Sequence, residues 1–158
     1  MIQGRAGVAS FERFTGVFRK LTQEHGELIG LLLRLKMTSS VEVRAELFPM
    51  LREELLAHER GEIDVLYAAL ERYDETRWSA LQHRREALKL GRLLDRVSAI
   101  DYEDETWGYA FAHLADSVQQ HAAEEEDELF PTAQRVIGLQ MAQLLRKRYE
   151  LTKIPTSH

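Results

Sequence analysis

The sequence predicts an all-α protein: an antiparallel up-down-up-down four-helix bundle with an additional C-terminal helix. Apolar residues recur at intervals of three and four along four long stretches, which is the period of a helix with one buried face. Only nine glycines and three prolines occur among the 158 residues, and the connections between the stretches are short. We expect one domain over residues 1–158, with the bundle at about 10–130 and the last helix at about 132–154.

The composition excludes several classes of protein. The net charge of −5 gives no general attraction to nucleic acid or to an anionic membrane. Because the chain has no cysteine, it cannot form disulfides, thiolate zinc sites, iron–sulfur clusters or cysteine nucleophiles. The longest apolar run, Leu28–Leu33, is too short to cross a bilayer, and residues 1–10 lack the apolar core of a signal peptide. We therefore expect a soluble cytoplasmic protein, and any metal ligands must be nitrogen and oxygen atoms.

The first predicted helix spans about Phe11–Met37 and begins after Ser10, a favourable N-cap residue. Its buried stripe comprises Phe14, Phe18, Leu21, His25, Leu28, Leu32 and Leu35. The imidazole of His25 therefore occupies a position where an apolar side chain is expected. Residues 37–40 break the pattern and supply cap residues for the next helix.

The second predicted helix spans about Val41–Tyr73. Its stripe comprises Leu47, Leu51, Leu55, His58, Glu62, Val65, Leu66 and Ala69. His58 and Glu62 thus lie on the buried face, four residues apart. Gly61 between them costs about 1 kcal/mol relative to alanine in a helix, and we expect it to permit the close approach of a neighbouring helix.

The third predicted helix, about Arg77–Ile100, follows a turn at Asp74–Thr76. Its stripe comprises Ala80, His83, Ala87, Leu90, Leu94 and Val97. His83 is again a histidine on the buried face, and the position one turn later is the small residue Ala87.

The fourth predicted helix, about Glu105–Phe130, follows a turn at Asp101–Asp104, and Pro131 stops or kinks it. Its stripe comprises Trp107, Phe111, Leu114, Val118, His121, Glu125 and Leu129, spaced four, three, four, three, four and four. His121 and Glu125 repeat the order and spacing of the pair in the second helix.

The last predicted helix covers about Thr132–Ile154, with Gly138 as a candidate break. The basic run Arg146–Arg148 suits the C-terminal end of a helix dipole, and we interpret it as solvated rather than as a nucleic-acid patch.

One metal site shared by the four bundle helices accounts for these polar residues on buried faces. A histidine and a glutamate four residues apart lie about 40° apart around a helix and about 6 Å apart along it, so one ion can contact both. A buried carboxylate without a partner is costly. We therefore expect six side chains to bind metal at one level of the bundle: His25, His58, Glu62, His83, His121 and Glu125. The alternative is a hydrogen-bonded polar core without metal, in which all six groups must be satisfied internally.

The ligand types restrict the metal. Imidazoles with carboxylates suit iron, manganese, zinc or copper. A lone structural zinc ion would use only four ligands, whereas six ligands with two carboxylates able to bridge suit two ions. Ferritin-like di-iron bundles order the pair as Glu-x-x-His, so the His-x-x-x-Glu order here disfavours that family.

The motifs resemble those of the hemerythrin-like (HHE cation-binding) domains. The matching segments are Gln23–His25, His58–Glu62 leading to Val65–Tyr67, Gln82–His83 and His121–Pro131. The resemblance covers roughly residues 10–135, and the tail at Lys153–Thr156 also looks family-like. It implies a bundle that holds two iron ions joined by an oxo or hydroxo bridge. The four histidines would then be terminal ligands, and the two glutamates would bridge the ions.

One position departs from the oxygen carriers of that family, which place a second histidine one turn after the third-helix ligand. Here that position is Ala87. Glu86, Glu59 and His113 are candidate replacements, although we expect Glu59 to face solvent and His113 to lie at the surface or behind the site. The departure disfavours simple reversible oxygen carriage. It leaves chemistry with oxygen, peroxide or nitric oxide, or iron sensing, open.

The remaining residues near these motifs are interpreted as structural. Glu124 and the run Glu126–Glu128 are expected to form a solvated acidic face. Trp78, Tyr67 and Phe130 are expected to pack in the bundle, although a tyrosine near a di-iron site can be redox-active.

The function predicted from the sequence is that of a non-haem di-iron protein that binds dioxygen or a related small ligand, such as peroxide or nitric oxide. One alternative is an iron or redox sensor that acts through a protein partner. Another is a peroxide-consuming di-iron enzyme that uses the coordination position opened at Ala87. No nucleophile motif, phosphate loop or dinucleotide fingerprint is present, so no catalytic residue is assigned and a binding protein is favoured over an enzyme.

Overall fold

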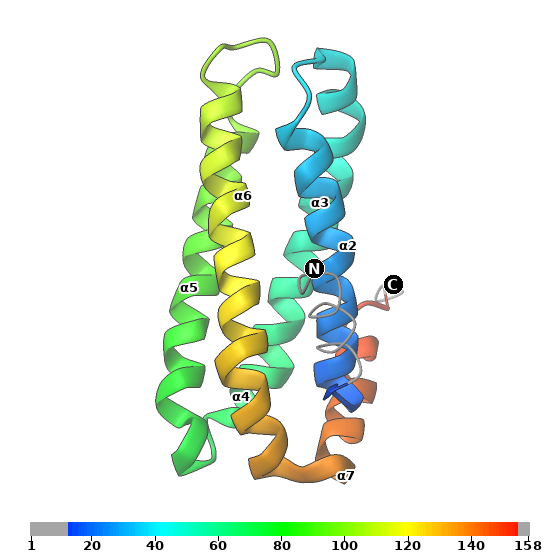
Figure 1. Ribbon diagram of the computed structural model, residues 1–158, viewed down its shortest axis with the longest axis vertical. Helices are drawn as coiled ribbons and strands as arrows, with labels where there is room; N and C mark the ends of the chain where they lie inside the picture. Colours follow the sequence, from blue (N-terminus) through cyan, green and yellow to red (C-terminus); the bar gives the residue numbers. More distant parts are fainter. Residues whose placement is uncertain (1–12, 155–158) are drawn as a thin grey trace, which may run out of the picture.

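Four long helices run along the long axis of the molecule and alternate in direction (Figure 1). The computed structural model describes residues 13–154, which contain helices and no β-strand. The bundle helices are α2 (Gly16–Lys36), α3 (Val41–Gly61), α5 (Asp74–Ser98) and α6 (Trp107–Glu124). The predicted up-down-up-down bundle is therefore confirmed. None of the helices in the described part of the chain is both long and apolar enough to cross a bilayer.

The predicted stripes form the interior of the bundle. Every apolar residue assigned to the stripes of α2, α5 and α6 is buried, since hiding these faces from water is the main driving force for packing. The buried apolar residues form two clusters. One includes Leu28, Leu55 and Val118, and the other includes Leu66 and Leu129. The predicted ligand positions fall between these clusters along the helices.

Two predictions about single residues in the bundle have opposite outcomes. Tyr67 and Phe130 are fully buried, so their predicted packing is confirmed. Trp78 is 71% exposed on α5, and its predicted packing is wrong. Its position lies off the buried stripe of that helix, and the guanidinium of Arg85 lies over its ring on the outside.

Two π-helical segments interrupt the bundle where no break was predicted. The segment η1 (Glu62–Tyr67) follows α3 and leads into the short helix α4 (Ala68–Leu70). The segment η2 (Glu125–Leu129) follows α6. A π-helical turn is wider than an α-helical turn and is frequent at functional sites. Each segment begins at the glutamate of a His-x-x-x-Glu pair, so both predicted carboxylates lie at a change in helical winding.

The helix ends partly follow the predictions. Ser40 caps α3, and its hydroxyl accepts a hydrogen bond of 3.2 Å from the backbone N–H of Val43. The predicted turn at Asp74–Thr76 is wrong, because these residues form the first turn of α5 and the connection is residues 71–73. Acidic side chains there favour the helix start through its dipole. The predicted cap at Ser10 lies outside the described residues, and α2 begins only at Gly16 because Thr15 is extended.

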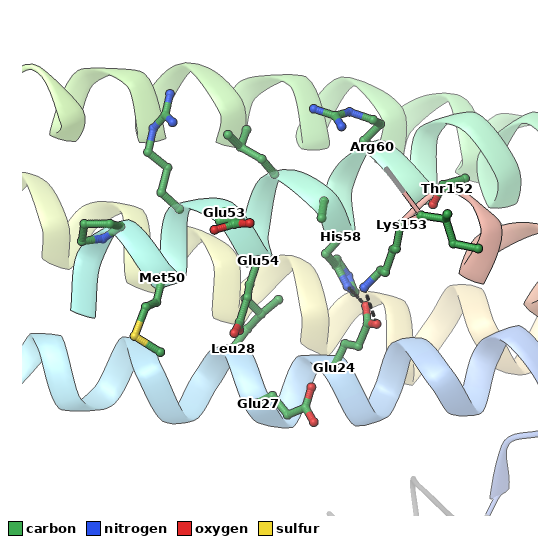
Figure 2. Close-up of a pocket in the computed structure, with 15 residues that line it drawn as sticks. Glu24, Glu27, Leu28, Met50, Glu53, Glu54, His58, Arg60, Thr152 and Lys153 are labelled. Atoms are coloured by element: carbon green, nitrogen blue, oxygen red, sulfur yellow. Dashed lines mark hydrogen bonds and ion pairs between the residues drawn. The ribbon is translucent and has the colours of Figure 1, made fainter. Parts of the chain in front are cut away.

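The C-terminal helix α7 (Phe130–Leu151) follows η2 without a loop. Pro131 is the second residue of α7, and the helical chain continues through it, so the proline does not end the helix. The predicted break at Gly138 is confirmed by its φ of 83° and ψ of 170°. Beyond that kink, α7 turns back along α2 (Figure 1). The residues after α7 reach a groove between α2 and α3, where Figure 2 shows Lys153 beside Glu24 and His58.

The close approach predicted at Gly61 is confirmed, and the neighbour is a side chain of α7. A Cβ atom at Gly61 would lie only 2.2 Å from Cε1 of Tyr149. The tyrosine ring is fully buried and has little room to move. Glycine at this position therefore lets α7 pack against the end of α3, next to His58 and Glu62.

A pair of glycine substitutions tests this packing in the metal-free protein. Gly61→Ala should lower the free energy of unfolding by about 1–3 kcal/mol, because the new methyl group overlaps the ring of Tyr149. Gly30→Ala is the matched control, since Gly30 is an exposed residue of α2 with nothing near its Cβ position. It should raise that free energy by about 0.5–1 kcal/mol. Urea unfolding measures both, and two stabilising substitutions would contradict the close contact at Gly61.

Candidate metal centre

All six predicted ligand residues are buried in one layer, each at most 5% exposed. The four imidazoles form two pairs. The ring centroids of His25 on α2 and His58 on α3 lie 5.0 Å apart. Those of His83 on α5 and His121 on α6 lie 5.1 Å apart. Histidines distant in the sequence thus meet because each occupies the buried stripe of its own helix.

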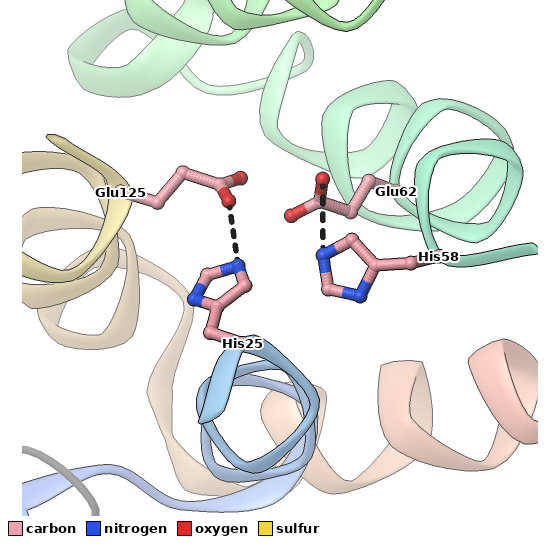
Figure 3. A group of neighbouring side chains, drawn as sticks. All are labelled: His25, His58, Glu62 and Glu125. Atoms are coloured by element: carbon pink, nitrogen blue, oxygen red, sulfur yellow. Dashed lines mark ion pairs between the residues drawn. The ribbon is translucent and has the colours of Figure 1, made fainter. Parts of the chain in front are cut away.

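The two carboxylates lie between the imidazole pairs. Oε1 of Glu125 is 3.1 Å from Nε2 of His25 and 3.8 Å from Nε2 of His121. Oε1 of Glu62 is 3.5 Å from Nε2 of His58 and 3.9 Å from Nε2 of His121. Figure 3 shows the two carboxylates facing each other, with His25 and His58 beside them. Each glutamate therefore approaches one imidazole from each pair.

The close groups include two glutamates outside the six predicted residues. Potential ligand atoms lie within 4.8 Å of one another in three groups: His25, His58, Glu62 and Glu125; His83, Glu86 and His121; and Glu59, Glu62 and His121. The structure thus places Glu59 and Glu86 at the site, whereas His113 is exposed on α6 as expected. The prediction that Glu59 faces solvent is wrong, because α3 packs against both α2 and α5 and buries a wider face than one stripe.

Tyr67 places a hydroxyl in the middle of the layer. Its oxygen lies 2.7 Å from Oε2 of Glu125, and 3.1 Å from both Oε1 of Glu62 and Nε2 of His121. Burial and the nearby carboxylates raise the pKa of Tyr67 well above its usual value, so the hydroxyl keeps its proton. The sequence predicted packing for this residue and left a redox role open, but it did not predict these hydrogen bonds. A signal was present, since Tyr67 follows Glu62 by five residues, the spacing that a π-helical turn brings together.

Three of the four imidazoles have their outer nitrogen paired with a carboxylate. The pairs are His25 Nδ1 with Glu126 Oε2 at 2.7 Å, His58 Nδ1 with Glu24 Oε1 at 2.9 Å, and His121 Nδ1 with Glu86 Oε1 at 3.1 Å. Such contacts fix the orientation of a metal-binding imidazole and direct its other nitrogen inward. The expectation that Glu126 belongs only to a solvated face is wrong, because the adjacent π-helical turn brings it against α2.

The electrostatics of the layer show that its groups hold protons. Burial by itself lowers the pKa of His25, but the neighbouring carboxylates of Glu125 and Glu126 raise it to about 9. Burial and the neighbouring charge of Glu62 raise the pKa values of Glu59 and Glu125. Protons therefore remain among these groups at neutral pH, and a bound cation can take their place.

Unpaired polar atoms in the layer fit a metal ion. In the described part of the chain, nine buried side-chain nitrogen or oxygen atoms have no hydrogen bond, and six of them lie here. The six are His25 Nε2, His58 Nε2, His83 Nδ1, Glu59 Oε2, Glu62 Oε2 and Glu125 Oε1. Buried polar atoms are normally paired, so their concentration at one level indicates a site for a charged ligand. Imidazole nitrogens with carboxylate oxygens are the donors that divalent transition metals prefer.

The protons of the layer predict how metal affinity depends on pH. His25, with a pKa of about 9, is protonated at neutral pH in the metal-free protein, and an ion must displace that proton. The apparent affinity for Co²⁺ should therefore rise about tenfold per pH unit for each proton displaced, between about pH 6 and pH 8. Titrations at a series of pH values measure this slope. An affinity that is constant or falls over this range would contradict proton displacement.

Comparison with known proteins agrees with this geometry. Residues 16–133 match the family model described as the hemerythrin HHE cation binding domain, and the matched region contains all six predicted ligands. No curated protein and no solved structure matches the chain. The match spans more than half of the chain, and the described residues carry the helical bundle and the buried histidine–glutamate clusters that suit a cation. The chain therefore belongs to the hemerythrin HHE cation-binding domain family.

Proposed function

We propose that this protein holds two iron ions and binds dioxygen or a related small ligand, such as peroxide or nitric oxide, inside the bundle. One observation carries the proposal. Two pairs of imidazoles flank two carboxylates, and each carboxylate lies within 4 Å of an imidazole from both pairs. This arrangement offers two neighbouring positions for ions, with Glu62 and Glu125 placed to bridge them.

The number and type of the donors support iron rather than a closed structural ion. His25 and His58 would hold one ion, and His83 and His121 would hold the other. The second position gains no third imidazole, because the residue one turn after His83 is Ala87. A structural zinc site would be filled by four protein ligands, whereas here a coordination position is left for an external ligand. When bound, a pair of iron ions supplies redox steps and open positions for dioxygen, peroxide or nitric oxide.

The residues of the chain itself provide the surroundings of this site. Apolar clusters on both sides of the layer limit the access of water and strengthen the electrostatic interactions between the polar groups. The hydroxyl of Tyr67, which keeps its proton, is a hydrogen-bond donor beside both bridging carboxylates. Glu24, Glu86 and Glu126 hold the outer nitrogens of three imidazoles. Together these contacts orient the donors before any ion binds.

Metal analysis and optical spectra test the proposal directly. Iron-loaded protein should contain about two iron ions per chain and show a near-ultraviolet band from an oxo group to iron. The spectrum of the reduced protein under nitrogen should change when air or nitric oxide is admitted. Less than one transition metal ion per chain after anaerobic loading would rule the proposal out, and a spectrum indifferent to these ligands would remove the ligand-binding role.

A carboxylate substitution tests the bridging position. Glu125→Gln should lower the affinity for iron at least about tenfold and bring the iron content below two ions per chain, because an amide is a poorer ligand than a carboxylate. Glu128→Gln is the matched control, since Glu128 is an exposed residue of the same π-helical segment. Iron content after gel filtration measures both variants. Equal iron content in both would show that Glu125 does not hold the metal.

A further inference from the structure

Glu24 on α2 is the meeting point of three hydrogen-bond donors from α3 and from the C-terminal end of the chain. Its Oε1 atom accepts a hydrogen bond from the hydroxyl of Tyr149 and lies 2.9 Å from Nδ1 of His58. Its Oε2 atom accepts a hydrogen bond from Nζ of Lys153. Figure 2 shows Lys153 and His58 next to each other, both reaching this carboxylate. The side chain is only 9% exposed, so these donors replace water around it.

The other outer carboxylates are held less firmly. The side chain of Glu126, which pairs with His25, is 20% exposed. The side chain of Glu86, which pairs with His121, is 35% exposed. Among the three, Glu24 is the most buried, and it is the one bound by side chains of the C-terminal segment. The imidazole of His58 thus has the most buried outer carboxylate partner of the layer.

The geometry of Tyr149 suits a role beyond packing. Its hydroxyl lies 3.4 Å from Nδ1 of His58, and its ring stands at 79° to the imidazole ring. The absence of a side chain at Gly61 makes room for this ring. Nζ of Lys153 lies 4.9 Å from the centroid of the same ring, so the two donors also hold each other in place. Both residues lie beyond residue 133, where the match to the family ends.

Building on the proposed function, we propose that Tyr149 and Lys153 are positioning residues of the metal centre. They hold the carboxylate of Glu24 so that it fixes the ring of His58 and directs Nε2 towards the ion shared with His25. The C-terminal helix, which lies outside the four-helix bundle, then helps to orient a ligand of one of the two ions. Its effect is confined to the His25–His58 side, because the hydrogen-bond contacts of Tyr149 and Lys153 described above do not reach His83 or His121.

Four variants of the full chain separate positioning from packing. Tyr149→Phe keeps the ring against Gly61 and removes only the hydroxyl. Lys153→Met removes the charge, and Lys153→Arg should restore it. Lys147→Met is the matched control, since Lys147 is an exposed lysine of α7, the helix that carries Tyr149. Three properties are measured for every variant. They are the affinity for each of the two iron ions, the Mössbauer spectrum of the iron-loaded protein and the thermal melting of the metal-free protein.

The expected result is a change at one ion only. Tyr149→Phe and Lys153→Met should lower the affinity for one of the two iron ions about tenfold to a hundredfold. A loss of this size is typical when a group that orients a metal ligand is removed. One Mössbauer doublet should change and the other should not, whereas Lys153→Arg and Lys147→Met should match the wild type. Glu86→Gln, which removes the partner of His121, should change the other doublet.

Two results would overturn the inference. In the first, both ions keep their affinities and spectra in Tyr149→Phe and Lys153→Met. In the second, the affinities for both ions fall by the same factor, and the metal-free protein loses thermal stability in proportion. That result would show that the two side chains act through packing alone. The iron content of the wild type reports separately on the proposed function. If the wild type fails to bind two ions, the di-iron proposal is refuted, whereas an unchanged variant beside a di-iron wild type refutes only the positioning role.

Discussion

The burial of a layer of ionisable side chains between two apolar clusters governs the architecture of this protein. Four imidazoles and three carboxylates occupy it: His25, His58, His83, His121, Glu59, Glu62 and Glu125. Removing so many charged groups from water is expensive unless each finds a partner. The protein meets part of this cost with outer carboxylates and with Tyr67, and the atoms that remain unpaired point to a cation. The bundle around the layer supplies the apolar burial that keeps these groups inside.

The backbone is adapted to this layer at the two glutamates. An α-helix has 3.6 residues per turn, so side chains spaced four residues apart rotate gradually around its axis and away from the buried face. A π-helical turn contains more residues and therefore keeps side chains at this spacing on the same face. Both π-helical segments begin at a glutamate, and buried residues follow each glutamate at intervals of four. They are Leu66 and Leu70 after Glu62, and Leu129 and Ala133 after Glu125. The wide turn after Glu62 also brings Tyr67 to the centre. The same change after Glu125 brings Glu126 against His25. The site thus depends on local winding as well as on helix packing.

The two halves of the layer are not equivalent. His25 and His58 both have outer carboxylate partners, whereas Nδ1 of His83 has no hydrogen bond. Burial and the neighbouring charge of His121 lower the pKa of His83, so this imidazole is the one most readily neutral in the absence of metal. The small residue Ala87 lies one turn after it and packs in the apolar cluster that contains Tyr67. In one half both imidazoles therefore have an outer carboxylate partner, whereas in the other half only His121 has one.

Helical periodicity was sufficient to predict the bundle, its alternating direction and the six inward-facing polar residues. A helix repeats every 3.6 residues, so the spacing of Phe111, Val118, His121 and their equivalents reveals which face of each helix is buried. That spacing says nothing about which side chains of neighbouring helices meet. The burial of Glu59 and the contacts of Glu24 and Glu126 with imidazoles follow from the packing of the helices against one another. The contact of Glu126 depends on the wide turn after Glu125, and the packing of Tyr149 beside Glu24 depends on the kink at Gly138 that returns α7 to α2. Contacts between elements are set by how the helices cross rather than by the period within any one of them.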